Sequence, residues 1–129
     1  MHRTTKSEFE YFKKRVYFWQ GVLGITWLDI NVDMTEPDLL VVDATVTAEY
    51  NVTVQYGSCF IGINKELPSK PSLIEFDRIA FHEVFEAGYF SRLRNLALGT
   101  YSSFEVEAAT HEAVRAAENT IFYKLRGGK

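Results

Sequence analysis

The sequence predicts an α+β fold in a single domain, residues 1–129, with an N-terminal helix, a three-stranded mixed or antiparallel sheet and two packed C-terminal helices. The first observation is a set of capping boxes that each precede an apolar pattern of helical period: Thr5 with Glu8, Ser72 with Glu75, and Ser102 with Glu105. The second is a change of the apolar period to two between the first and second of these segments. Runs of one element type followed by runs of another favour the α+β class.

The first helix is expected over residues 6–20 and is followed by Gly21 and Gly24. Its apolar residues recur at spacings of three and four, which places them on one buried stripe: Phe9, Phe12, Val16 and Trp19. Other aromatic side chains exceed what one buried face needs and are candidates for contact with another chain: Tyr11, Tyr17 and Phe18.

Three strands are expected next, over residues 26–32, 43–54 and 59–64. In the first two, side chains of alternating character predict a strand with two different faces. Cys59, in the third strand, is expected to face the interior rather than to act as a nucleophile. Because it is the only cysteine, the chain can form neither an internal disulfide nor a thiolate metal cluster.

The last two helices are expected over residues 73–98, with Gly88 as a weak point, and over residues 103–125. A short connection joins them, which favours antiparallel packing. The final helix carries a stripe of mostly small residues suited to close contact: Val106, Ala109, Ala113, Ala117 and Ile121.

Composition excludes several classes of protein. Hydrophobic residues make up 47% and charged residues 24%, which indicates a globular chain. The net charge of -3 gives no electrostatic basis for binding nucleic acid. The N-terminus lacks the apolar core of a signal peptide, and no apolar run approaches the roughly 20 residues that span a membrane. We therefore expect a soluble, cytoplasmic protein without a membrane or nucleic-acid partner, and the sequence leaves its oligomeric state open.

Residues 81–90, FHEVFEAGYF, contain the motif that points to chemistry. His82, Glu83 and Glu86 form an H-E-x-x-E variant of the zinc-protease pattern H-E-x-x-H. Residues four apart share one face of a helix, so His82 and Glu86 point the same way, and both are zinc-ligand types. Glu83 is rotated by about 100° from His82. In zinc hydrolases the glutamate at that position holds the metal-bound water and takes its proton.

A catalytic zinc site usually has three protein ligands, so the motif needs one more. His111, in the middle of the last helix, is the leading candidate, and Glu107, one turn earlier, is the alternative. If both helices are straight, His82 and His111 differ in level by roughly 12 Å. The difference shrinks if the earlier helix ends near residues 93–95.

The structural alternative needs no metal. His82 and Glu86 lie on a largely apolar segment, where burial requires a partner, and they can pair with each other. His111 would then be an ordinary exposed helix residue. A carboxylate-rich manganese or iron site would need more converging glutamates than the sequence places.

Four segments carry a resemblance to a known family: KKRVYFWQGVLGITWLDINV, ATVTAEYNVTVQYGSCFIGIN, DRIAFHEVFEAGY and EAATHEAVRAAENTIF. Over nearly its whole length the chain resembles small phage-encoded zincin-like metallopeptidases, a minimal form of the gluzincin architecture. Four residues match the first motif of that family: Ala80, His82, Glu83 and Val84. Five match the second: His111, Val114, Arg115, Glu118 and Asn119.

The resemblance implies a zincin-like fold and a zinc peptidase that acts on a peptide or protein substrate. It implies that Glu83 is the general base and that His82, Glu86 and His111 hold the zinc. Where the family is expected to have a glutamate ligand in the last helix, this chain has Thr110. An exchange of positions would keep two histidines and one carboxylate.

The resemblance also implies a setting and a mode of substrate binding. Residues 59–64 would form the edge strand of a cleft, to which an extended peptide adds. A phage protein would act in the host cytoplasm or in the virion, with a phage or host protein as its partner. The alternative function is a degenerate zincin that serves as a phage structural or partner-binding protein.

Overall fold

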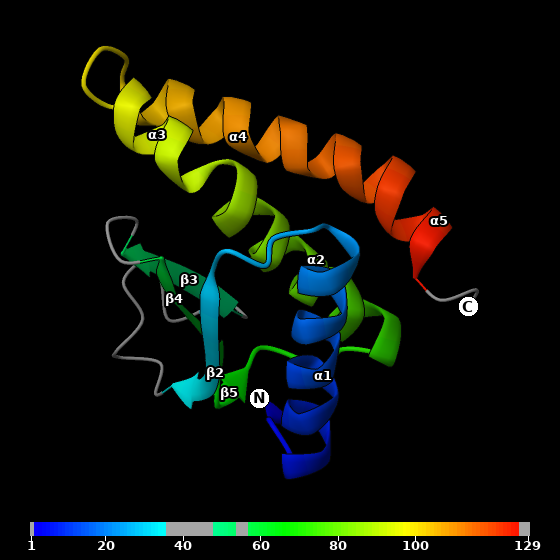
Figure 1. Cartoon of the computed structure of the whole chain (residues 1–129). Helices are drawn as coiled ribbons and strands as arrows, with labels where there is room; N and C mark the ends of the chain where they lie inside the picture. The colour runs from blue at the N-terminus through cyan, green and yellow to red at the C-terminus, as the bar shows by residue number, and fades with distance from the viewer. Residues whose placement is uncertain (1, 36–47, 54–56, 127–129) are drawn as a thin grey trace.

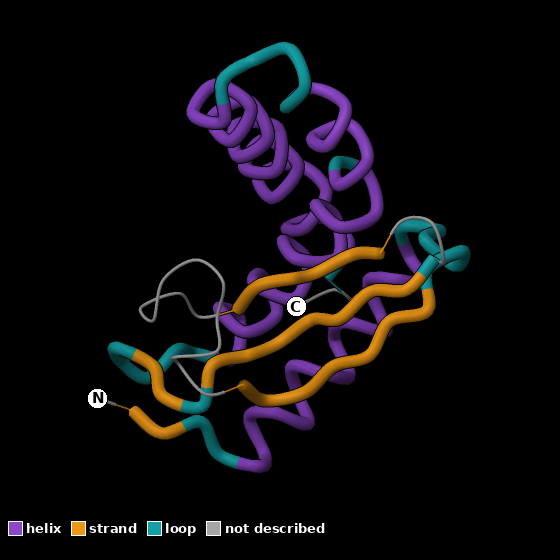
Figure 2. The backbone as a smooth tube through the Cα atoms, turned by 90° about the vertical axis from the view of Figure 1, so that its left-hand side faces the viewer, coloured by secondary structure: helices purple, strands orange, loops and turns teal. Residues whose placement is uncertain are grey.

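The computed structural model of the chain describes residues 2–35, 48–53 and 57–126 (Figure 1). Helices and strands are both present, and apart from a two-residue strand at the N-terminus the described strands follow the first helix and precede the others. This order confirms the α+β class. The helices lie on one side of the main group of strands (Figure 2). None of the helices among the described residues combines the length and the apolar character that crossing a membrane requires.

Helix α1 (Lys6–Val22) begins with the predicted capping box. Thr5 Oγ1 accepts from the backbone N–H of Glu8 at 3.1 Å, and Glu8 Oε1 accepts from the N–H of Thr5 at 2.9 Å. The predicted stripe forms the buried face of the helix, except that Phe9 is only half-buried: Phe12, Val16 and Trp19. The helical period therefore located both the start of this element and its core face.

The main strands lie in the order β2 (Asp29–Thr35), β4 (Ser58–Asn64) and β3 (Ala48–Thr53). β4 runs parallel to β2 and antiparallel to β3. β2 starts three residues later than predicted. Of the strand predicted over 43–54, only residues 48–53 fall within the described part of the chain.

β4 is the central strand, so the expectation that residues 59–64 form the edge of a cleft is wrong. From Ile61 to Asn64 every residue is buried, which is typical of a strand with neighbours on both sides. Cys59 is buried, which confirms its interior position. A second sheet pairs β1 (His2–Arg3) with β5 (Glu66–Leu67), so the prediction of a single sheet is incomplete.

The helix predicted over residues 73–98 is two helices, α2 (Leu73–Tyr89) and α3 (Ser91–Ala97), so the expectation of one continuous helix is wrong. The break falls at Phe90. Beside it, Ser91 Oγ donates to the carbonyl of Ala87 at 2.7 Å. A serine that bonds back to the carbonyl four residues earlier competes with the backbone ladder and bends helices.

The last predicted helix comprises α4 (Ser103–Ala117), a π turn η3 (Glu118–Phe122) and a short α5 (Tyr123–Leu125). The buried residues of this segment recur at every fourth position: Val106, Thr110, Val114, Glu118 and Phe122. On a regular α-helix, side chains spaced by four residues shift by about 40° around the axis at each step, and the wider π turn offsets part of this shift. The predicted small-residue stripe is wrong at Ala109, which is exposed, whereas Ala113 is half-buried and Ile121 is half-buried against the core.

The core joins the helices to one another and to the strands. Trp19 of α1, Phe81 of α2 and Phe122 of η3 pack together, with ring centroids 5.0–5.6 Å apart. Below these rings, buried Asp77 accepts from Trp19 Nε1 at 2.8 Å and from Arg15 Nε at 2.7 Å. These contacts fix α2, the helix that carries H-E-x-x-E, against α1 and the end of the chain.

Candidate metal centre

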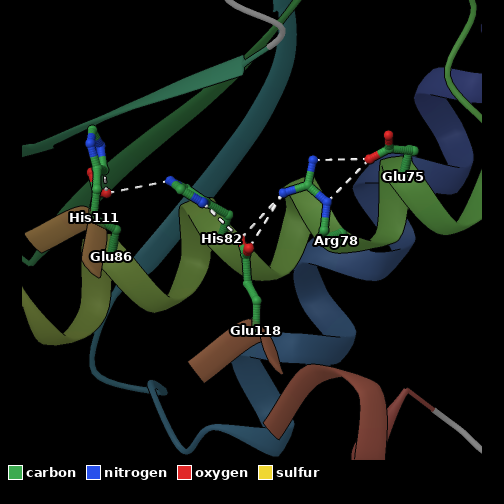
Figure 3. Close-up of polar contacts among 6 residues, drawn as sticks. All are labelled: Glu75, Arg78, His82, Glu86, His111 and Glu118. Carbon is green, nitrogen blue, oxygen red and sulfur yellow. Dashed lines mark hydrogen bonds and ion pairs between the residues drawn. The ribbon is translucent and has the colours of Figure 1, made fainter. Parts of the chain in front are cut away.

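The candidate site lies where α4 passes α2 (Figure 3). His82 and Glu86 lie one turn apart on α2, and His111 comes from the middle of α4. Because the helix breaks at Phe90, α2 and α3 are not one straight helix, and the offset of level expected for two straight helices does not apply. His111 Nε2 reaches Glu86 Oε2 at 3.6 Å.

The three candidate ligands converge. His82 Nε2 lies 3.4 Å from Glu86 Oε2, and His111 Nε2 lies 3.6 Å from the same oxygen. One potential ligand atom from each residue lies within 4.8 Å of the other two. Nitrogen and oxygen atoms bound to tetrahedral zinc at about 2.0–2.1 Å are about 3.3 Å apart. Two of the three separations are close to this value already, and the donor set of two imidazoles and one carboxylate suits zinc.

The carboxylate oxygen at the centre of this group, Glu86 Oε2, has an unusual environment. Glu86 Oε2 is buried and accepts no hydrogen bond within the described part of the chain. Its contacts with the two imidazoles, at 3.4 and 3.6 Å, are longer than a good hydrogen bond. A buried carboxylate oxygen without a hydrogen bond is costly. A cation held between Glu86 and the two histidines would satisfy it.

A chain of charged groups holds His82 from the other side (Figure 3). His82 Nδ1 lies 2.9 Å from Glu118 Oε2, and Glu118 in turn accepts from Arg78 at 3.4 Å. Arg78 also donates to Glu75 at 2.9 Å. A carboxylate on Nδ1 fixes the ring and leaves Nε2 facing Glu86, which is the arrangement that orients histidine ligands in metal sites.

The electrostatics of the metal-free site favour a charged His82. Burial of the ring lowers its pKa, but the contacts with Glu118 and Glu86 and the charges of Glu83 and Glu86 outweigh burial and raise the pKa to about 10. Burial raises the pKa of Glu86, but His82, with help from the charges of His111 and Arg94, brings it below its ordinary value. His82 is then an imidazolium at neutral pH, and a metal must displace its proton.

The remaining candidates lie outside this group of three. Glu107, the alternative third ligand, pairs with Arg94, and its side chain is 42% exposed. Glu83 is buried near Cys59 of β4, where burial of the thiol and, to a lesser extent, the charge of Glu83 raise the pKa of Cys59 to about 12. Thr110 is also buried and donates its hydroxyl to the carbonyl of Val106 at 2.8 Å. His111, rather than Glu107, is therefore the residue of α4 that meets His82 and Glu86.

Sequence reasoning missed the role of Glu118 and Arg78. Glu118 follows His111 by seven residues, which is two helical turns, so both lie near one face of the last helix. Arg78 precedes His82 by four residues and follows Glu75 by three, spacings that also share a face. These spacings are visible in the sequence, but the contacts of Glu118 with His82 and Arg78 could not be inferred without knowing how α2 and the last helix are placed relative to each other.

Comparison of the chain with protein-family models, curated proteins and solved structures finds no match.

Proposed function

We propose that this protein is a zinc-dependent hydrolase of the phage zincin-like type, acting on peptide bonds of a peptide or protein substrate. The observation that carries the proposal is Glu86 Oε2, a buried carboxylate oxygen that faces two imidazoles and accepts no hydrogen bond from the described residues. The H-E-x-x-E motif and its resemblance to the zinc-protease pattern support the choice of metal and reaction.

Each residue of the site has a role in the proposed reaction. His82, Glu86 and His111 hold the zinc, and Glu118 positions His82 through Nδ1. When bound, zinc supplies Lewis acidity and lowers the pKa of water. Glu83, next to His82 on α2, acts as the general base that takes a proton from the attacking water.

The test is the metal content of the purified protein after incubation with zinc, measured by ICP-MS on the parent and on His82→Ala, Glu86→Ala and His111→Ala. We expect one zinc per chain in the parent and loss of zinc in all three variants. Glu107→Gln is the matched control, because Glu107 lies on the same helix outside the group, and it should keep its zinc. A parent that binds no zinc would overturn the proposal.

Glu83→Gln separates metal binding from hydrolysis. It should keep the zinc and lose about 10²–10⁴-fold in the rate of cleavage of a labelled unfolded protein, the usual contribution of a general base. Loss of zinc in this variant would show that Glu83 acts on the site in another way.

A second function is favoured by a different observation, namely that each ring nitrogen of His82 already faces a carboxylate. In this alternative the cluster is a structural ion network, and the chain is a degenerate zincin that binds a partner or forms part of a virion. It predicts a folded parent without zinc.

A further inference from the structure

The candidate metal centre is most open to solvent at His111. The side chain of His111 is 49% exposed, compared with 27% for His82 and 8% for Glu86. A substrate that approaches a metal held by these three residues therefore meets the face of α4 that carries His111. The other exposed residues of that face are in a position to decide which substrates bind.

Two long side chains share this face of α4 with His111. Phe104 precedes His111 by seven residues and Arg115 follows it by four, and both spacings return a side chain to nearly the same direction on an α-helix. Ala108, which is also exposed, lies between Phe104 and His111 on the same face. We call these four residues, Phe104, Ala108, His111 and Arg115, the His111 face.

Arg115 provides a positive charge next to the candidate site. Within the described part of the chain, this exposed arginine forms no hydrogen bond or ion pair, whereas Arg78 and Arg94 are both paired with glutamates. Long side chains on a helix lean toward its N-terminus, which directs Arg115 back over the turn that contains His111. A guanidinium is always charged and forms paired hydrogen bonds with a carboxylate. Arg115 is therefore suited to bind a carboxylate of the substrate.

Phe104 provides an apolar surface at the other end of the His111 face. It is 82% exposed, the largest fraction among the large apolar residues of the described chain. Single exposed apolar residues are common, so this exposure alone would not mark a site. Its position on the same face as a candidate metal ligand places Phe104 where an apolar side chain of a bound peptide would cover the ring.

The aromatic residues of α1, which the sequence suggested for contact with another chain, are less available. Tyr11 and Phe18 are only partly exposed and pack against the core. The hydroxyl of Tyr17 donates to the carbonyl of Ile30 at 2.9 Å. These residues mainly support the fold, in contrast to Phe104.

We propose that the His111 face binds a peptide that carries a carboxylate near Arg115 and an apolar side chain near Phe104; this inference rests on the proposed function. Along α4, Arg115 lies roughly 6 Å and Phe104 roughly 10 Å from the level of His111. An extended peptide rises about 3.3 Å per residue. The carboxylate is then about two residues from the bond at the metal, and the apolar side chain is about three residues away on the other side.

Fluorescence anisotropy of labelled peptides tests the proposal, with Glu83→Gln protein so that a bound peptide is not cleaved. The peptides carry Phe and Asp about five residues apart, in both chain directions, and a matched set has Asn in place of Asp. We expect the Asp peptide of one direction to bind about tenfold or more tightly than its Asn counterpart. Adding Arg115→Gln should abolish this preference. Arg115→Lys should keep part of it, because lysine retains the charge but not the paired hydrogen bonds.

Two further sets of peptides define what the His111 face recognises. Peptides that end at the position of the Asp, with a free or an amidated carboxyl terminus, distinguish a carboxylate of the chain end from one of a side chain. Phe104→Ala should weaken binding of the Phe peptides by about fivefold or more. The same substitution should leave unchanged the binding of peptides in which Ala replaces Phe.

Arg3→Gln and Leu73→Ala are the matched controls. Arg3 is an exposed arginine of β1, at the opposite end of the molecule from the hairpin of α3 and α4 (Figure 1). Leu73 is 59% exposed and begins α2 at the end remote from that hairpin. Both variants should bind the peptides as the parent does, and circular dichroism checks that every variant is folded.

Zinc content is measured on the same samples, and peptide binding is repeated after EDTA treatment. Equal binding of the Asp and Asn peptides, or a preference that Arg115→Gln leaves intact, would overturn the inference even if zinc is bound. So would a parent that binds none of the peptides. A chain without zinc that still shows the Arg115-dependent preference would overturn the proposed function instead and leave the His111 face as a peptide-binding surface.

Discussion

At the scale of single residues, the candidate site depends on one carboxylate oxygen. Glu86 Oε2 faces His82 and His111, and Glu118 holds the far side of the His82 ring. The ligand candidates His82, Glu86 and His111 were predicted from residue type and helical spacing. Glu118 received no role, because the value of a carboxylate on Nδ1 appears only once two separate helices are placed together.

The role of Glu118 leads to a prediction about zinc affinity. Glu118→Gln keeps the size of the side chain but removes the charge that orients His82, so zinc affinity should fall about 10–100-fold. Competition with a chromophoric chelator measures this. Glu75→Gln is the control, since Glu75 reaches the site only through Arg78 and is half-exposed. Equal affinities in the parent and Glu118→Gln would show that the contact at 2.9 Å does not orient the ligand.

The pKa of His82 leads to a prediction about stability. In the folded, metal-free protein the pKa is raised from 6.5 to about 10, so the folded state holds this proton more tightly than the unfolded state does. The stabilisation is full below pH 6.5 and is lost as pH rises through 10. Urea unfolding of EDTA-treated protein should show a loss of a few kcal/mol over this range, at about 1.4 kcal/mol per unit of pKa shift.

His82→Gln provides the comparison for that titration. Its unfolding free energy should vary less with pH between these limits. A parent as stable at high pH as at neutral pH would contradict the assigned ion cluster.

At the scale of elements, the site depends on where α2 ends. The N-cap residues Thr5, Ser72 and Ser102 and the apolar periods located the starts of all three predicted helices, because these signals are local. Of the three predicted capping boxes, only Thr5 with Glu8 has both of its hydrogen bonds. The break at Phe90 and the π turn at Glu118 were missed, since they depend on Ser91 bonding back to Ala87 and on the packing of Phe122 against α1 and α2. The central position of β4 was also missed, because strand order depends on long-range pairing that a single strand pattern does not encode.

Gly88 is a point where α2 must lack a side chain. Ile25 packs so closely that its Cγ1 and Cγ2 would lie 2.8 Å from a Cβ at this position. Gly88→Ala should therefore lower the free energy of unfolding by about 1–3 kcal/mol through overpacking, despite the better helix propensity of alanine. Thermal and urea denaturation measure the change.

The control for this substitution is Gly21→Ala. Gly21 is also helical, in α1, and a Cβ there would meet nothing within 4 Å. This variant should be neutral or slightly stabilising. If Gly88→Ala were equally benign, the close packing of Ile25 on α2 would not constrain the helix.

At the scale of the whole molecule, the body (α1, α2 and the strands) and the hairpin of α3 and α4 position different residues of the candidate site. The body anchors α2 through the buried Asp77, Trp19 and Arg15 contacts and so holds His82 and Glu86 in place. The hairpin returns α4 across α2 and brings His111 to the same candidate site. The fold class was predictable from the order of the elements, but the way in which α4 returns across α2 to complete the candidate site was not.

X-ray absorption at the zinc edge of the zinc-loaded protein tests the central claim most directly, because it reports which atoms touch the metal. The proposed site predicts nitrogen and oxygen ligands at about 2.0–2.1 Å, two of them imidazoles, in the parent, and no bound zinc in His111→Ala. A sulfur ligand at about 2.3 Å, or a spectrum without imidazole, would contradict the assignment of His82, Glu86 and His111 as the metal centre.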